Sequence, residues 1–296
     1  MEINIGDTIG IIALSGDCER EKVEQSKAYF ESYGFNVKLS KNIFDKDRYL
    51  AGSDEDKISE LHRFFEDDEI KLIMCARGGY GAIRLINKID YDLIKANPKP
   101  FCGFSDVTAL LLMIYKRTGL VTYHSPMACT DFLSGTTKPE TLLGVGYTQR
   151  NFFKTITGKN LQYKGKRMYK SGFVKAPLWG GNLSTVVSLC GQDFIPDNDF
   201  IFFAEDLNEP VYKIDKMFQQ LINIPEFSEN CKGILLGEFL GVDNQAWLYQ
   251  YFEELSNHLN IPVLSGLKIT HADEKITLPI GRIAQLNGRF LSIVQD

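Results

Sequence analysis

The chain has 296 residues, which is long enough for one large domain or two ordinary domains, each with a sizeable core. Its 44% hydrophobic and 24% charged residues are typical of an ordinary globular protein. The formal net charge of -5 gives no general attraction to nucleic acid or to acidic membranes, so neither is an expected partner.

The N-terminus and the cysteines bear on the cellular compartment. Residues 1–20 place acids on both sides of a short apolar run and lack the basic start and small-residue cleavage site of a signal peptide. No stretch reaches the roughly 18 consecutive apolar residues that a transmembrane helix needs. We therefore expect a cytoplasmic protein. Its 6 cysteines are widely spread, with no C-x-x-C pair, so reduced and mostly buried thiols are expected.

The first half of the chain alternates strand-like and helix-like periods. Because short strands and amphipathic helices follow one another at this spacing, a parallel sheet covered by helices on both faces is predicted. The predicted strands are 8–14, 35–40, 70–76 and 99–104, and the predicted helices are 19–34, 56–69, a short one at 82–89 and one after residue 105.

The pattern changes after about residue 150. Residues 151–175 are locally basic and poor in acids, without a clear helical period, which predicts a connection or an exposed hairpin. Beyond them, short strands punctuated by Gly and Pro are predicted at 199–206, 231–239, 261–269 and 275–288, with helices at 211–223 and 244–260. We predict an N-terminal α/β domain (1–150), an inter-domain connection (151–175) and a smaller, β-rich, barrel-like mixed α/β domain (176–296).

Ser105, in the sequence G-F-S-D, is the first candidate for chemistry. It follows a predicted strand and opens an apolar helical pattern, and Gly103 permits a tight turn. In α/β proteins such a strand end displays nucleophiles, and the first free N–H groups of the helix are close enough to stabilise an oxyanion. The alternative is that Ser105 or Asp106 only caps the helix, which is the commoner outcome for this stretch taken alone.

The glycine cluster R-G-G-Y-G follows another predicted strand. Gly78, Gly79 and Gly81 would let the backbone approach a ligand or form an anion-binding nest. The cluster is not a dinucleotide motif, because Arg84 stands where the third glycine belongs, and it lacks the Lys-Ser/Thr ending of a P-loop. A donor loop beside Ser105 and an ordinary strand-to-helix turn both fit these residues.

A serine nucleophile needs a base, usually a histidine oriented by a carboxylate. Of the 4 histidines, His62 and His258 fall on polar or terminal parts of helices and are predicted to be solvated. His124 follows a strand in the same half as Ser105, and His271 lies on a polar loop between two apolar segments. The residues alone leave both as alternatives for the base.

Two acids close the almost wholly apolar stretch D-F-I-F-F-A-E-D. Glu205 and Asp206 at the mouth of a buried strand are placed where a carboxylate can orient a catalytic histidine. A solvated strand end is the alternative for this pair taken alone.

Together these segments resemble the LD-carboxypeptidase family of serine peptidases (family S66), which includes the microcin C self-immunity peptidases. The resemblance rests on IMCARGGYGAIRLI, KPFCGFSDVTALL, TYHSPM, LWGGNLS, FFAEDLNEPVYKIDKMFQQL and GLKITHADEKITLPIG, in the family's order and over nearly the whole chain. It implies a flavodoxin-like or Rossmann-like N-terminal domain, a smaller β-rich C-terminal domain and an active site at the domain interface.

The resemblance also implies the catalytic residues. Ser105 matches the family's nucleophile, Glu205 its triad glutamate and His271 its general base, which leaves His124 a structural role. One departure lies beside the base, where the family commonly has Gly and this chain has Thr270, a residue with less backbone freedom.

The resemblance also implies which residues form the oxyanion hole and which bind the substrate. The backbone N–H groups of Gly78, Gly79 and Asp106 would form the oxyanion hole. A carboxypeptidase must also hold the free carboxylate of its substrate, and the candidate substrate-binding residues are Arg77, Arg84 and Asn182.

The implied activity is hydrolysis of the bond between an L-centre (diaminopimelate or lysine) and the terminal D-alanine of murein tetrapeptides, in peptidoglycan recycling. No metal or other cofactor is required, and the family allows a homodimer. The alternatives are an immunity-type peptidase cleaving an aminoacyl-nucleotide analogue, with Trp179 as candidate stacking residue, and a non-catalytic peptide-binding protein. An α/β-hydrolase is disfavoured because Val107 replaces the second glycine of G-x-S-x-G.

Overall fold

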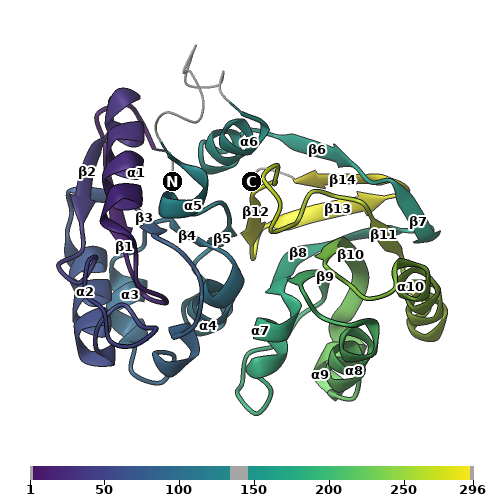
Figure 1. Cartoon of the computed structure of the whole chain (residues 1–296). Helices are drawn as coiled ribbons and strands as arrows, with labels where there is room; N and C mark the ends of the chain where they lie inside the picture. Colours follow the sequence, from purple (N-terminus) through teal and green to yellow (C-terminus); the bar gives the residue numbers. More distant parts are fainter. Residues whose placement is uncertain (1–2, 134–145, 294–296) are drawn as a thin grey trace. The chain divides into compact units, whose positions relative to one another are not determined.

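The computed structural model describes residues 3–133 and 146–293. The chain forms two compact units (Figure 1). The N-terminal unit comprises Met1–Lys159 with Ile276–Pro279, and the C-terminal unit comprises Asn160–Lys275 with Ile280–Asp296. The chain therefore returns once to its N-terminal unit. No helix in the described ranges is both long enough and apolar enough to span a membrane.

The N-terminal unit is built on a six-stranded sheet with the order β12-β5-β4-β3-β1-β2. Neighbouring strands from β5 to β2 pair in parallel, as the alternating sequence pattern predicts. The strands are β1 (Thr8–Ile12), β2 (Asn36–Leu39), β3 (Ile70–Cys75), β4 (Phe101–Gly103), β5 (Thr122–His124) and β12 (Leu278–Ile280).

Helices cover both faces of this sheet because successive residues of a strand point to opposite sides. Ile9 and Ile11 of β1 belong to an apolar cluster with α1 (Arg20–Ser32), α5 (Ala128–Asp131) and α6 (Tyr147–Ile156). On the other side, Gly10 leaves room for Phe64 of α2 (Asp54–Glu66). α3 (Tyr91–Ala96) contacts both α2 and α4 (Thr108–Thr118).

The C-terminal unit contains an eight-stranded mixed sheet with the order β6-β14-β13-β8-β9-β10-β11-β7. The central strands β8 to β11 are parallel, and the outer pairs are antiparallel. Gly165 and Lys166 alone separate β6 from β7, the two ends of this order, so the sheet curls back on itself in the predicted barrel-like manner. The strands are β6 (Leu161–Lys164), β7 (Arg167–Lys170), β8 (Phe173–Asn182), β9 (Phe200–Leu207), β10 (Cys231–Leu240), β11 (Val263–Ser265), β13 (Ile283–Asn287) and β14 (Phe290–Ile293).

Four helices accompany this sheet (Figure 1). They are α7 (Leu183–Ser188), α8 (Val211–Ile222), α9 (Pro225–Asn230) and α10 (Gln245–Leu259). Phe218 of α8 and Phe227 of α9 contact the ring of Phe202 on β9, and Phe218 also meets Tyr251 of α10. An aromatic layer thus joins these helices to the parallel part of the sheet.

Two predicted segments differ from the structure. The expected connection over 151–175 contains most of α6 and the strands β6 and β7, and the units divide after Lys159. The helical period of α6 is hidden in the sequence because Thr148, Asn151 and Thr155 fill buried positions. The short helix expected at 82–89 is only one 3-10 turn, η1 (Ala82–Arg84).

Candidate active site

Ser105 lies in a sharp turn between β4 and the helical segment that follows. Its φ is 61°, a left-handed conformation that costs a residue with a side chain about 1–2 kcal/mol. The chain continues through the 3-10 turn η2 (Ser105–Val107) directly into α4. Gly103 is needed here, because an added Cβ would lie 2.7 Å from Cγ1 of Val107. This strained strand-to-helix turn is the geometry of a nucleophile elbow.

The glycine cluster after β3 approaches this turn closely. A Cβ added at Gly78 would lie 3.0 Å from Cβ of Ser105 and 3.1 Å from its Oγ. Gly79 has a φ of 121°, which favours glycine. In the described part of the chain, the backbone N–H groups of Gly78, Gly79 and Asp106 donate to no acceptor. Unpaired amide donors beside a nucleophile can stabilise an oxyanion.

A hydrogen bond ties these two loops together. Oδ2 of Asp106 accepts the N–H of Ala82 at 2.9 Å. Asp106 is buried, so this bond is shielded from water. The residue after Ser105 therefore holds the glycine loop in place, a role that the motif did not reveal.

A recess of about 490 Å³ opens beside the glycine loop. Arg77 lines it together with Gly79 and two tyrosines, Tyr49 and Tyr80. The Arg77 guanidinium donates to two backbone oxygens, those of Gly78 at 3.3 Å and Asp17 at 3.2 Å. Both acceptors are neutral, but the Asp17 carboxylate also lines the recess, and Lys46 and, more weakly, Arg77 lower its pKa. An anionic ligand in the recess would therefore share the Arg77 charge with Asp17.

Glu205 and His271 form a pair in the C-terminal unit. Glu205 lies on β9 with a fully buried side chain, and its Oε2 is 2.6 Å from Nδ1 of His271. Burial raises the pKa of Glu205, while the hydrogen bond from His271 opposes this shift. A carboxylate at Nδ1 fixes the tautomer in which Nε2 can accept a proton. Thr270, the departure noted in the sequence, accepts the N–H of Ala272 at 3.0 Å and so orders this loop.

The other predicted residues have structural partners. Arg84 pairs with Asp54 at 3.0 Å, and Asn182 donates to Asp206 at 3.0 Å while its Oδ1 caps α7. Their roles as substrate ligands stay predictions.

His124 is buried and packs its ring edge-on against Phe104 of the same unit.

Trp179 cannot serve as the exposed stacking residue considered above. Its side chain is 0% exposed and packs against Phe194, Phe200 and Phe202. The second half of β8 is buried on both faces, since residues 178–182 are all buried, so this ring lies in the core. The expectation for Trp179 is therefore wrong.

Comparison with known proteins gives consistent matches in both halves of the chain. The LD-carboxypeptidase N-terminal domain matches residues 9–125, and the LD-carboxypeptidase C-terminal domain matches residues 175–286. A probable murein peptide carboxypeptidase of Bacillus subtilis (strain 168) is 35% identical, over 96% of this chain and 90% of that protein.

Solved structures agree with this result. An MccF-like protein from Bacillus anthracis has a TM-score of 0.89 at 25% identity, covering 100% of this chain and 98% of that one. A muramoyltetrapeptide carboxypeptidase from Oxalobacter formigenes has a TM-score of 0.87 at 26% identity, covering 97% and 99% respectively.

Proposed function

Since this chain belongs to the LD-carboxypeptidase family of serine peptidases (S66), we propose that it removes the terminal D-alanine from murein tetrapeptides. The observation that carries the proposal is Ser105, held at a φ of 61° beside backbone donors that have no acceptor among the described residues. A serine that only capped a helix would not need this conformation, because a cap residue has extended backbone angles.

The mechanism we propose is acyl transfer through a triad of Ser105, His271 and Glu205. Nε2 of His271 takes the Ser105 proton while Oγ attacks the carbonyl carbon of the scissile amide. Glu205 stabilises the imidazolium, and His271 then donates the proton to the departing amine of D-alanine. Water, deprotonated by the same histidine, hydrolyses the resulting ester and restores the serine.

Backbone amides stabilise the charge that develops in this reaction. The oxyanion of each tetrahedral intermediate would accept from the N–H groups of Gly78, Gly79 and Asp106. Arg77, in the adjoining recess, is our candidate for the free carboxylate of the terminal D-alanine.

An immunity-type peptidase remains the second candidate, because the MccF-like protein has the same fold. The buried Trp179 removes the stacking residue that this alternative had in the sequence. A murein substrate is favoured by the names of two relatives, the B. subtilis and O. formigenes proteins. A non-catalytic peptide-binding protein would have no need of a strained serine.

The test is D-alanine release from a murein tetrapeptide by wild-type protein, Ser105→Ala and the control Ser228→Ala, an exposed serine on α9. We expect release by wild type and the control alone, unchanged by a chelator. Equal release by Ser105→Ala would refute the serine mechanism. Cleavage of an aminoacyl-nucleotide analogue in place of the tetrapeptide would support the second candidate.

A further inference from the structure

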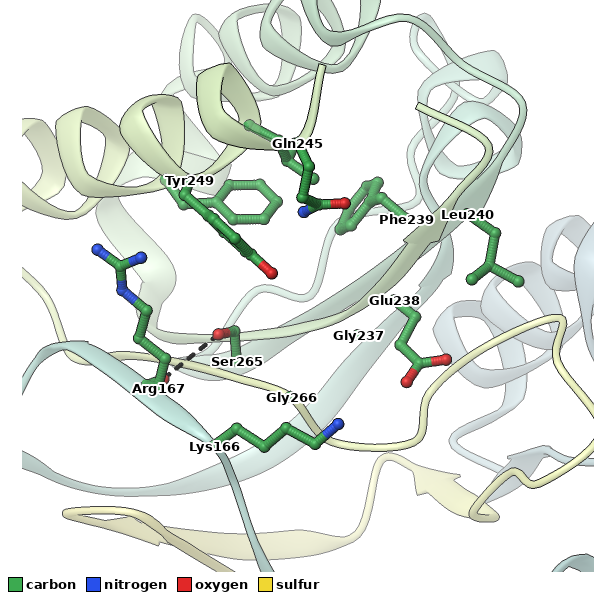
Figure 2. A pocket seen from close by; sticks show the side chains of 12 residues that line it. Lys166, Arg167, Gly237, Glu238, Phe239, Leu240, Gln245, Tyr249, Ser265 and Gly266 are labelled. Carbon is green, nitrogen blue, oxygen red and sulfur yellow. Dashed lines mark hydrogen bonds between the residues drawn. The ribbon is translucent and has the colours of Figure 1, made fainter. Parts of the chain in front are cut away.

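A pocket of about 430 Å³ lies in the C-terminal unit, toward the carboxyl ends of β10 and β11 (Figure 2). Its apolar floor is formed by buried residues of β10 and α10, Phe239, Leu248 and Phe252. Lys166 and Glu238 bring charged groups to it. Ligands of α/β sheets bind outside the carboxyl ends of parallel strands, and the mechanism proposed above uses none of these side chains.

An irregularity in the sheet places this pocket beside the catalytic carboxylate. The pairing of β9 with β10 shifts register between Leu236 and Phe239, which leaves Gly237 and Glu238 opposite Glu205. Such a bulge changes the direction of a side chain and is common next to active sites. Here it brings Glu238 into the lining of the pocket (Figure 2).

The same bulge supports the histidine loop. The N–H of Glu238 donates to the carbonyl oxygen of Ile269 at 2.8 Å, two residues before His271. A Cβ at Gly237 would lie 3.0 Å from Cβ of Glu205 and 2.2 Å from the Ile269 oxygen, so only glycine fits. The pocket wall therefore directly adjoins both Glu205 and the loop that carries the base.

Two oppositely charged side chains line the pocket without forming an ion pair. Among the described residues, neither the Lys166 amine nor the Glu238 carboxylate has an ion-pair or side-chain hydrogen-bond partner. Figure 2 shows the Lys166 amine pointing toward the side of the pocket where the Glu238 carboxylate lies. Arg167, by contrast, is paired with Glu253 at 3.6 Å. A ligand group that carries both charges can bind between Lys166 and Glu238.

We propose that this pocket receives the side chain of the substrate residue whose carbonyl is attacked, and that Glu238 and Lys166 select a zwitterionic end. This inference rests on the proposed function. Diaminopimelate ends in an α-amino acid group, so its ammonium would meet Glu238 and its carboxylate would meet Lys166. Its methylene groups would pack on Phe239 and Phe252. A lysine side chain supplies the ammonium alone and leaves Lys166 without a partner.

The test compares kcat/KM for tetrapeptides that carry diaminopimelate or lysine at this position. We expect kcat/KM of wild type to be higher for the diaminopimelate peptide by about tenfold or more, because one charge-assisted hydrogen bond usually contributes about that factor. Lys166→Met should lower only the diaminopimelate reaction by that factor, and Glu238→Gln should lower both. Lys216→Met, an exposed lysine on α8, is the matched control and should behave as wild type.

Calorimetric binding of both peptides to Ser105→Ala protein separates this inference from the proposed function. If wild type releases no D-alanine from either peptide, the proposed function fails. A diaminopimelate preference in Kd that Lys166→Met abolishes would still support the pocket assignment. Equal affinities, or a preference that survives Lys166→Met in both kinetics and binding, would overturn it.

Discussion

The Ser105 turn and the pair formed by Glu205 with His271 depend on different physical effects for their arrangement. The Ser105 turn depends on backbone geometry, with a positive φ at the serine and nearby amides that have no acceptor among residues 3–133 and 146–293. The pair depends on electrostatics, because a fully buried carboxylate is held 2.6 Å from an imidazole. Backbone strain at the Ser105 turn and desolvation of the Glu205 carboxylate both lower the free energy of unfolding. The two regions should therefore respond differently to substitution.

The largest effect is expected at Ser105. Ser105→Ala and Ser105→Gly should each lower kcat/KM at least about 10,000-fold, because both remove the nucleophile. The two should differ in stability, since glycine adopts a φ of 61° without strain while alanine retains it. We expect the glycine variant to be more stable than the alanine variant by about 1 kcal/mol in denaturant titrations. Equal stabilities would show that the turn is not strained.

Glu205→Gln should lower kcat by about 1,000-fold or more, because a neutral amide neither fixes the tautomer of His271 nor stabilises its charged form. D-alanine release under saturating peptide measures this loss. A variant with nearly full activity would contradict the assigned role.

The same substitution should change how stability depends on pH. Burial raises the pKa of Glu205 above its usual 4.5, so the folded protein holds this proton more tightly than the unfolded chain does. The contribution of Glu205 to stability is therefore largest below pH 4.5 and is lost as pH rises through the raised pKa. The side chain of Glu205→Gln does not ionise, so this loss of stability at higher pH disappears. Thermal unfolding at neutral pH should therefore show that the variant is more stable than wild type. A destabilised variant would mean that the hydrogen bond to His271 outweighs the desolvation.

Gly78→Ala should lower kcat by about 100-fold with little change in KM. The added Cβ would meet Ser105 at 3.0 Å and displace the nearby amide donors, and one oxyanion donor is worth about that factor. Gly233→Ala is the matched control, because its Cβ would meet its nearest neighbour at an ordinary 3.4 Å. Wild-type kcat in Gly78→Ala would exclude this loop from the oxyanion hole.

The smallest effect is expected at Asp106, which acts through the glycine loop. Asp106→Ala removes the acceptor of the Ala82 N–H and should lower kcat by about tenfold. Asp106→Asn keeps an oxygen acceptor and should restore most of the activity. If both variants fail equally, the negative charge and not the hydrogen bond is what matters.

Local signals in the sequence account for much of the predicted site. Ser105 and Gly78 follow apolar strands and Glu205 lies near the end of one, and the strand ends of an α/β sheet are where ligand sites form. The residues alone left His124 and His271 open, and only the family resemblance favoured His271. The expected cytoplasmic location and homodimer stay predictions.

Other features depend on tertiary packing and have no local signal. The buried polar residues Asn151 and Thr155 concealed α6, and the burial of Trp179 follows from the aromatic layer beneath β8. The position of Glu238 depends on a register shift against β9, a strand about 30 residues away in sequence. Sequence periodicity carries no information on such pairings.

A double-mutant cycle on Ser105 and His271 tests the proposed triad, with kcat measured for D-alanine release from a murein tetrapeptide. Residues that act as one catalytic unit are strongly non-additive. If the two residues form one triad, Ser105→Ala, His271→Ala and the double variant should all lose kcat to nearly the same residual level. Losses that multiply in the double variant would mean that the serine and the histidine act independently, and would contradict the proposed triad.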